Sequence, residues 1–415
     1  MNKNFLALGL AAALLAPQVA GAEGFAINEW SAEGVAMGGA RMFAEDDAAN
    51  VAYNPASITK VKGEVMKSSY TYLSPHGNYK LYDSNNDEIK GEPTHNKVHA
   101  GWAVGSYYVR QINDKEWFGI GAFPRFAMVS EFERASKAST NAFFSKLNGV
   151  SVTPTYAHKF DKKWSAAVGA EINYVGLELQ KNLVIPTAGV NGTTQIEGES
   201  YALGWNAAAN YAFDDKNEIG VVYRSRIKHS LEADFKMYPA SGGKITADAY
   251  GVVTLPDSWD IGYNHKFDKK TRLELKATRT NWSTYDALNI SLSNPSVPSV
   301  LPSNVDSAKN WSNGWRYAIG LEHNFSDKYA AMAGFAFDEA SIPYNGGDFM
   351  VPTGLRRTYS IGARYNDKKQ TVAVALGWMD VGNLDFAGHA TDAYKSAHAY
   401  DSFTKIASIS YQRKF

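Results

Sequence analysis

The C-terminal segment Ala407-Ser-Ile-Ser-Tyr-Gln-Arg-Lys-Phe415 alternates between apolar and polar residues almost to its end. Ala407, Ile409, Tyr411 and Phe415 share one face, because successive side chains of a β-strand point to opposite sides. Arg413 interrupts that face only near the end, where an interfacial charge is tolerated. The segment predicts a strand with one apolar and one polar face.

The same alternation recurs over residues 201–211, 259–267 and 315–325. About ten alternating residues is the length with which a tilted strand crosses a bilayer, whereas strands of soluble sandwiches usually have about five or six residues. The repeated pattern therefore predicts strands that face lipid on one side and a barrel interior on the other.

Short polar turns built on the dipeptide Asp-Lys separate these segments, and most of them follow an aromatic residue. Aromatic side chains beside short turns are typical of the girdle at one rim of a membrane barrel. The turns are Asp114-Lys115, Asp161-Lys162, Asp215-Lys216, Asp268-Lys269, Asp327-Lys328 and Asp367-Lys368. They place both chain ends on the short-turn side.

Dividing the chain at these turns predicts an all-β fold, a 14-stranded antiparallel transmembrane outer-membrane β-barrel over residues 63-415. The predicted strands are 65-82, 97-111, 116-130, 149-160, 163-183, 199-213, 217-236, 248-267, 271-292, 313-325, 328-341, 355-366, 370-382 and 401-415.

Composition excludes several classes of protein. The 415 residues include 42 basic and 42 acidic residues and no cysteine, which disfavours a nucleic-acid-binding protein and excludes disulfides and thiolate metal sites. The sequence has no run of eighteen apolar residues, so it predicts no membrane-spanning helix. Residues 1-22 combine Lys3, an apolar run and Ala20-Gly21-Ala22, the order of a cleaved secretory signal peptide. We expect export to the bacterial cell outer membrane.

Residues 23-62 do not alternate and are rich in small residues. A barrel of this size has an interior wide enough to hold a plug or to leave a channel. We expect this segment to be an N-terminal hatch, or plug, inside the lumen.

The stretch from Gly24 through Asp46-Asp47 to Asn54-Pro55-Ala56 resembles the hatch of the FadL/TodX/OmpP1 family of outer-membrane hydrophobic-compound transporters. Further matches are Thr254-Leu-Pro-Asp-Ser-Trp259, Thr280-Asn-Trp-Ser283 and Trp315-Arg316. The resemblance implies passive, hatch-gated uptake of long-chain fatty acids or aromatic hydrocarbons past the lipopolysaccharide layer. It also implies sideways release through a kinked third strand that the hatch motif Asn54, Pro55 and Ala56 faces. The terminal Phe415 resembles the signal read by the barrel-assembly machinery, and we expect a monomer.

The predicted third strand carries Gly119, Gly121, Phe123 and Pro124. Proline cannot donate to the ladder and glycine permits a bend, so a local break in strand pairing follows. Either the break is the lateral opening or it is an ordinary barrel irregularity.

Candidate substrate contacts are apolar residues of the hatch and inward-facing bases. The apolar set is Phe25, Ile27 and Trp30, with Phe123 on the barrel wall. The bases expected to face inward are Arg224, Arg226, Lys228, Lys276, Arg316 and Arg364. They either form lumen ion pairs with Glu171, Glu274 and Glu322, or one arginine stays unpaired and binds a carboxylate.

Other functions have less support in the sequence. Between the strands, only residues 132–146 could supply a substantial helix for first capture of a solute. Asp83 opens a calcium-like loop, but Glu88 and Thr94 stand where the loop needs glycine and glutamate, so we expect no metal and no cofactor. The sequence contains no catalytic nucleophile motif, so it does not predict an enzyme. A general aqueous porin is the main alternative, and a barrel phospholipase is a third hypothesis.

Overall fold

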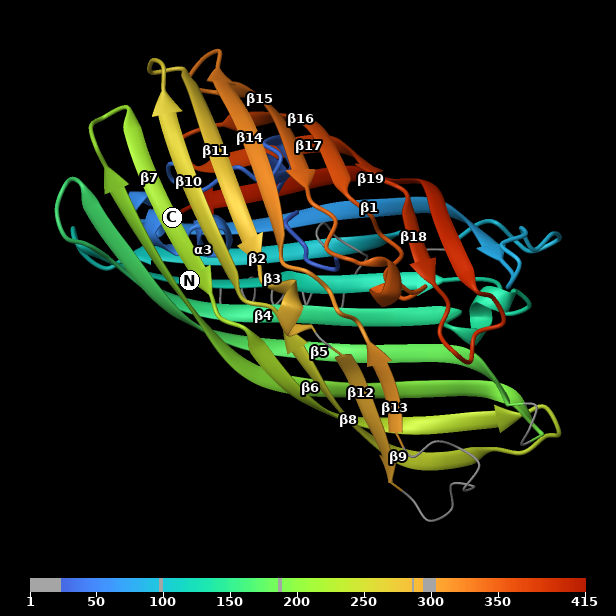
Figure 1. The fold of residues 1–415 in the computed structure, drawn as a ribbon. Helices are drawn as coiled ribbons and strands as arrows, with labels where there is room; N and C mark the ends of the chain where they lie inside the picture. Colours follow the sequence, from blue (N-terminus) through green and yellow to red (C-terminus); the bar gives the residue numbers. More distant parts are fainter. Residues whose placement is uncertain (1–23, 97–99, 186–188, 286, 294–303) are drawn as a thin grey trace.

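The computed structural model describes residues 24–96, 100–185, 189–285, 287–293 and 304–415, so the expected signal peptide lies outside the described residues. The described chain forms one closed antiparallel barrel (Figure 1). Its sheet has 19 strand segments, and five barrel strands are each interrupted and count twice, which gives 14 barrel strands. The predicted fold class is confirmed.

Nine barrel strands are continuous and five are interrupted. The continuous strands are β1 (Glu64–Tyr82), β2 (Gly101–Gln111), β3 (Glu116–Glu131), β4 (Phe144–Lys159), β5 (Trp164–Ile185), β6 (Val190–Ala212), β15 (Tyr329–Asp338), β16 (Arg356–Asn366) and β19 (Ser396–Lys414). The interrupted strands are β7 (Asn217–Arg224) with β8 (Ile227–Pro239), β9 (Ile245–Leu255) with β10 (Ser258–Lys266), β11 (Thr271–Thr280) with β12 (Ala287–Ser293), β13 (Asn304–Ala308) with β14 (Gly314–Asn324), and β17 (Gln370–Val381) with β18 (Leu384–Ala387).

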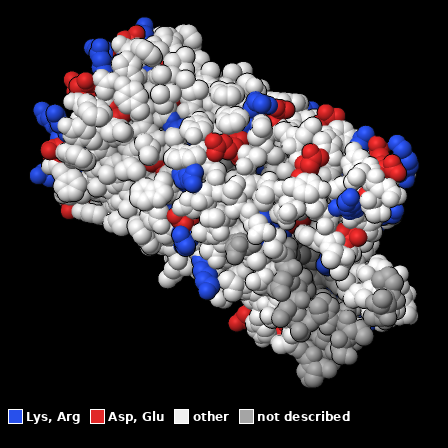
Figure 2. Space-filling model, viewed as in Figure 1, with Lys and Arg blue, Asp and Glu red and all other residues white. Residues whose placement is uncertain are grey.

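The outer surface carries the apolar face of the alternating pattern. Val168, Leu203 and Ile361 point outward and are 57%, 77% and 62% exposed. The polar residues that alternate with such positions along a strand point into the lumen and are buried. Phe160 and Phe325 lie beside short turns and are also exposed. Figure 2 shows charged side chains crowded around the short turns at the upper left, next to largely uncharged surface. This surface suits a bilayer.

The short turns are stabilised by their aspartates. The Oδ1 of Asp161 accepts hydrogen bonds from the backbone N–H groups of Lys163 and Trp164 at 2.7 and 2.8 Å. Asp268 and Asp367 accept two such bonds in the same way. Asp therefore recurs because its carboxylate satisfies the backbone donors of a tight turn.

The segment of residues 24–63, called the N-terminal segment below, lies inside the barrel. It contains α2 (Ala32–Ala36), α3 (Asn50–Tyr53) and the 3₁₀ turn η1 (Pro55–Lys60). Helix α2 packs on β15, β16, β17 and β19, and η1 packs on β3, β4, β5 and β6, so the segment spans the lumen. At Gly38 it approaches the wall so closely that a Cβ on Gly334 would lie 2.2 Å from the Gly38 nitrogen.

Residues 132–146, the stretch that could supply a substantial helix, do not form one. The described chain has a single 3₁₀ turn there, η2 (Lys137–Thr140), and β4 already begins at Phe144. The alternation that starts at Phe144 continues an existing ladder with β3 and β5, and this pairing wins over local helix propensity.

The outer apolar belt generates a stability prediction. Changing Ile361, which is outward-facing between Tyr359 and Tyr365, to arginine should destabilise the barrel in lipid vesicles by about 2 to 4 kcal/mol, because the guanidinium is placed in hydrocarbon. A denaturant titration of vesicle-inserted protein measures this. The control Glu199→Arg also changes an outward-facing residue, but at a position already occupied by a charge. Equal stability of the two variants would contradict a lipid-facing belt.

Candidate functional site

The wall of the barrel is incomplete between β2 and β3. These strands pair only from Gln111 with Trp117 to Ser106 with Ala122. Beyond Ala122, β3 continues to Glu131 paired with β4, and its register shifts between Pro124 and Phe126. Among the described residues, no ladder joins β2 to this second half of β3, so one edge of β3 is free inside the sheet.

The N-terminal segment occupies that free edge. The N–H of Ile27 donates to the carbonyl of Arg125 at 2.8 Å, and the N–H of Ala127 donates to the carbonyl of Phe25 at 2.8 Å. Ala26 and Phe126 thereby form an antiparallel bridge. The Trp30 Nε1 donates to the Pro124 carbonyl at 2.6 Å. Backbone groups that β2 leaves unpaired are thus satisfied by a segment from the chain start.

Aromatic rings surround this contact. The Phe25 ring lies 4.9 Å from Trp282, 5.2 Å from Tyr285 and 5.9 Å from both Phe126 and Trp311, measured between centroids. A second group joins Trp30 to Tyr53 and Phe123 at 5.1 and 5.2 Å. Of the predicted apolar contacts, Ile27, Trp30 and Phe123 thus share one cluster and Phe25 belongs to another, and all four are buried.

Sequence reasoning did not assign Trp282, Tyr285 or Trp311 to the site. The run 280–283 was noticed as part of the family resemblance, but nothing local links it to Phe25. These rings approach Phe25 only because the barrel closes around the N-terminal segment.

Tyr53 links the two halves of the N-terminal segment. Its hydroxyl accepts hydrogen bonds from the N–H groups of Trp30 and Ser31, both at 3.1 Å, and donates to the Asn28 carbonyl at 3.2 Å. Burial raises the pKa of this phenol, so it stays protonated and keeps its donor.

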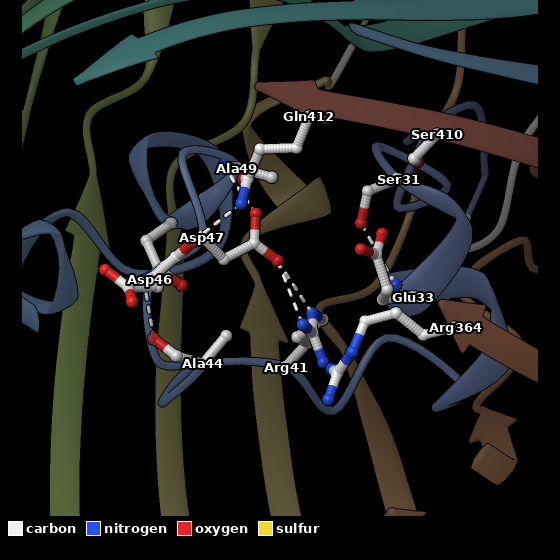
Figure 3. A network of polar contacts seen from close by, with 12 residues as sticks. Ser31, Glu33, Arg41, Ala44, Asp46, Asp47, Ala49, Arg364, Ser410 and Gln412 are labelled. Atoms are coloured by element: carbon white, nitrogen blue, oxygen red, sulfur yellow. Dashed lines mark hydrogen bonds and ion pairs between the residues drawn. The ribbon is translucent and has the colours of Figure 1, made fainter. Parts of the chain in front are cut away.

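A buried charge network, shown in part in Figure 3, fixes the middle of the segment. Asp47 accepts from Arg41 at 3.0 Å and from Lys67 of β1 at 2.9 Å, and Lys67 also pairs with Glu33 at 2.8 Å. Arg41 reaches Glu322 of β14 at 3.2 Å. Burial alone would raise the pKa of Asp47, but Lys67 and Arg41 outweigh it and hold that pKa well below its ordinary value. Asp47 therefore stays ionised and ties the segment to the wall.

The motif of Asn54, Pro55 and Ala56 packs mainly elsewhere than on the kink. The Asn54 Nδ2 donates to Asn210 of β6 at 2.7 Å, its Oδ1 accepts from the Ala56 N–H at 3.1 Å, and Pro55 starts η1. The Val51 side chain lies close to both Gly119 and Gly121, since a Cβ on these glycines would lie 2.8 and 3.0 Å from its methyl groups. The expectation that Asn54 faces the kink is wrong, because this amide needs a polar partner and finds one on β6.

The expected inward bases do not all face the lumen. Arg224, Lys276, Arg316 and Arg364 do. Lys276 pairs with Asp260 at 3.1 Å, Arg316 with Asp338 at 3.0 Å and Arg364 with Glu322 at 2.6 Å. Arg226 and Lys228 point outward, so their expected place is wrong.

The cause is an extra residue where β7 ends and β8 begins. Strand β6 pairs Asn206 with Arg224 but Glu199 with Glu232, which is a shift of one residue, and such a shift moves the following side chains to the other face. The Arg226 side chain is 59% exposed and pairs with Asp257 at 3.1 Å.

One cavity that borders the barrel wall is smaller than a usual ligand pocket. A cavity bordered by Tyr79, Met128, Phe349 and Met379 measures about 80 Å³, whereas ligand pockets usually have at least about 300 Å³. Among the described residues, no set of three His, Asp or Glu side chains could hold a metal ion. Within the same residues, no helix is both long and apolar enough to cross a bilayer.

Comparison with known proteins identifies the family. Residues 13–415 match the model of the outer membrane transport proteins OMPP1, FadL and TodX. The chain belongs to the OMPP1/FadL/TodX family. The predicted resemblance and outer-membrane location are confirmed.

Individual members of the OMPP1/FadL/TodX family are distant relatives. The chain is 23% identical to the long-chain fatty acid transport protein of Escherichia coli K12, with 90% of this chain and 91% of that protein covered. It is 24% identical to outer membrane protein P1 of Haemophilus influenzae, with 88% and 86% covered.

Two solved structures of the family show the same fold. The crystal structure of a Pseudomonas aeruginosa FadL homologue has a TM-score of 0.85 at 18% identity, with 95% of this chain and 100% of that chain covered. The structure of the P. putida toluene transporter TodX has a TM-score of 0.69 at 16% identity, with 93% and 98% covered.

The charge network predicts which substitution loosens the N-terminal segment. Changing Asp47 to asparagine removes a carboxylate shared by Lys67 and Arg41, so Lys67 keeps only Glu33 and Arg41 keeps only Glu322. Breaking a buried ion pair typically costs about 3 to 5 kcal/mol. Amide hydrogen exchange across residues 32–54 should therefore speed up by about 100-fold or more in detergent-solubilised protein. Asp380→Asn, which breaks the half-exposed pair with Arg357 at 3.3 Å, serves as the matched control and should change little. Unchanged exchange in the Asp47 variant would refute the anchoring role.

Proposed function

We propose that this protein takes up hydrophobic compounds passively across the outer membrane, gated by residues 24–62 as a hatch, and releases them sideways between β2 and β3. The solute enters the lumen from outside, displaces the start of the hatch from β3, and leaves through the unpaired wall into the lipid. Release into the bilayer also keeps an apolar solute out of the periplasmic water.

One observation carries this proposal. The second half of β3 has lost β2 as its partner, and the hatch supplies replacement hydrogen bonds from Phe25 and Ile27. An open strand edge in hydrocarbon leaves backbone groups without hydrogen bonds, which costs too much free energy to persist. A hatch that can withdraw supplies these hydrogen bonds between transport events.

The network around Asp47 supports gating by a small movement. Residues 33–47 are tied to β1 and β14 by buried ion pairs, whereas residues 25–30 meet β3 through a few hydrogen bonds and ring contacts. The start of the hatch can therefore move while its middle stays anchored. Opening of this kind is the usual way in which a mobile segment gates a site.

No energy source is needed for the proposed transport. Moving apolar surface from water into hydrocarbon returns about 0.8 kcal/mol per methylene group, so the path runs downhill for an alkyl chain or an aromatic ring. The lumen offers aromatic and aliphatic walls around Phe25 and Trp30 for the intermediate stage.

The substrate class follows the named relatives. One relative is a long-chain fatty acid transport protein and one structural neighbour is a toluene transporter, so we infer fatty acids or aromatic hydrocarbons as substrates. The alternative of a general porin fits less well, because α2 and η1 reach opposite walls of the lumen.

Several expectations from the sequence stay predictions. They are cleavage of the signal peptide, passage through the lipopolysaccharide layer, recognition of Phe415 by the assembly machinery, and a monomeric state.

A disulfide across the gate tests the movement. Ala26 and Phe126 form a bridge without mutual hydrogen bonds, the pair geometry in which Cβ atoms come closest. The double variant Ala26→Cys with Phe126→Cys, in a chain that has no other cysteine, should take up labelled oleate or toluene when reduced and lose that uptake when oxidised. Uptake by the oxidised form at the reduced rate would exclude gating here, and Ala26→Cys alone controls for oxidation.

The kink gives a second test. Pro124→Val restores a backbone donor where the ladder with β2 fails, so regular pairing is favoured and uptake should fall several-fold. Pro154→Val is the matched control, because Pro154 lies in β4 opposite Ile120, where the ladder with β3 is continuous and the gap between β2 and β3 is not involved. If both variants fold and transport at the rate of the unchanged protein, release does not occur at this kink.

A further inference from the structure

Arg224 of β7 is buried without a counterion. Its side chain is 1% exposed, and its Nη2 donates to the carbonyl of Ala52 at the end of α3. Its Nε and Nη1 are buried with no acceptor. The guanidinium carbon lies 5.7 Å from the centre of the Trp30 ring and 5.8 Å from that of Phe123. A charged donor in this state is costly, so it calls for an explanation.

The other buried cations of the lumen show what Arg224 lacks. A carboxylate oxygen lies within salt-bridge distance of Arg41, Lys67, Arg125, Arg272, Lys276, Arg316 and Arg364. In the described part of the chain, Arg224 forms no such pair.

The carboxylates that act on Arg224 are already used. Glu171 accepts two hydrogen bonds from Arg125 at 2.9 Å and one from Ser151 at 2.6 Å. Asp260 lies 3.1 Å from the Lys276 ammonium and accepts from Thr278 at 2.6 Å. Glu171 and Asp260 are thus matched by their own cations, and the charge of Arg224 is left over.

A second residue points to the same missing group. Asn206 of β6 is the cross-strand partner of Arg224 in register, and its side chain faces the lumen with no exposure. Both its Nδ2 and its Oδ1 are buried without a partner. Arg224 and the Nδ2 of Asn206 therefore present unpaired donors on one patch of wall, next to the unpaired acceptor Oδ1 of Asn206. A carboxylate, with acceptor lone pairs only, is the group that such donors bind.

We propose that Arg224 and Asn206 form a binding site for the carboxylate of a hydrophobic acid passing from the lumen to the gap between β2 and β3. The proposal rests on the proposed function and names the head group of its substrate. Trp30 and Phe123 border both Arg224 and the kink, so they hold apolar parts of the solute next to its charge. The site forms when Trp30 moves with the start of the hatch.

The test compares two ligands that differ only in charge. Oleate and methyl oleate share one alkyl chain, and their binding to the full-length mature protein in detergent micelles can be measured with radiolabelled ligand. We expect Arg224→Gln to weaken oleate binding by about tenfold or more, because a charge-assisted hydrogen bond is lost, and to leave methyl oleate within about twofold. Asn206→Ala should weaken oleate binding less.

Controls separate a binding role from a structural one. Arg224→Lys keeps the charge and should retain part of the preference for oleate, and Arg357→Gln removes an arginine from the outer face and should change neither ligand. Heat-modifiable migration on a denaturing gel shows whether each barrel is folded. An equal loss of both ligands in Arg224→Gln would mean that Arg224 only supports α3, and this overturns the proposal.

Two further outcomes separate the carboxylate site from the proposed transport function. If the unchanged protein binds both ligands equally and Arg224→Gln alters neither, the carboxylate site is refuted while transport of hydrophobic compounds stands. If the unchanged protein binds neither ligand, the carboxylate site is refuted, and uptake of labelled toluene then decides whether the proposed function stands.

Discussion

Every backbone N–H and C=O that reaches hydrocarbon must find a partner, and the structure depends on this constraint. It closes the sheet by pairing β1 with β19 from Val65 to Tyr82. It also explains why the second half of β3, which β2 abandons after Ala122, is paired by Phe25 and Ile27 of the N-terminal segment. The weak place in the wall and the segment that covers it are two consequences of one requirement.

The interior follows a different rule, because polar groups there are removed from both water and lipid. Most buried cations are matched by carboxylates, as Lys67 and Arg41 are by Asp47, and these pairs hold the N-terminal segment by its middle. Its start meets β3 through backbone hydrogen bonds and ring contacts. The buried ion pairs around Asp47 thus lie in the middle of the segment, away from the edge of β3.

The strands were predictable because the two-residue period of β-strand side chains coincides with the alternation between lipid and lumen that a membrane barrel requires. The alternation over 355-366 gave β16 to within one residue, since side-chain geometry and the bilayer both demand it. Arg226 was misplaced because a single extra residue reverses the face, and composition does not reveal it. Residues 132–146 could have formed a helix, but strand pairing from Phe144 onward outweighs local propensity. Trp282 and Trp311 were missed because closure alone brings them to Phe25.

The sequence by itself determined the number of strands, the lipid-facing side of most of them and the outer-membrane location, since these depend on periodicity and on turn residues read locally. Only the tertiary structure decided which backbone edge is left open and which arginine lacks a carboxylate. Both depend on the register between strands far apart in the chain. That register is set by bulges such as those at Arg125 and Ser225-Arg226, and by the N-terminal segment packed inside the closed wall.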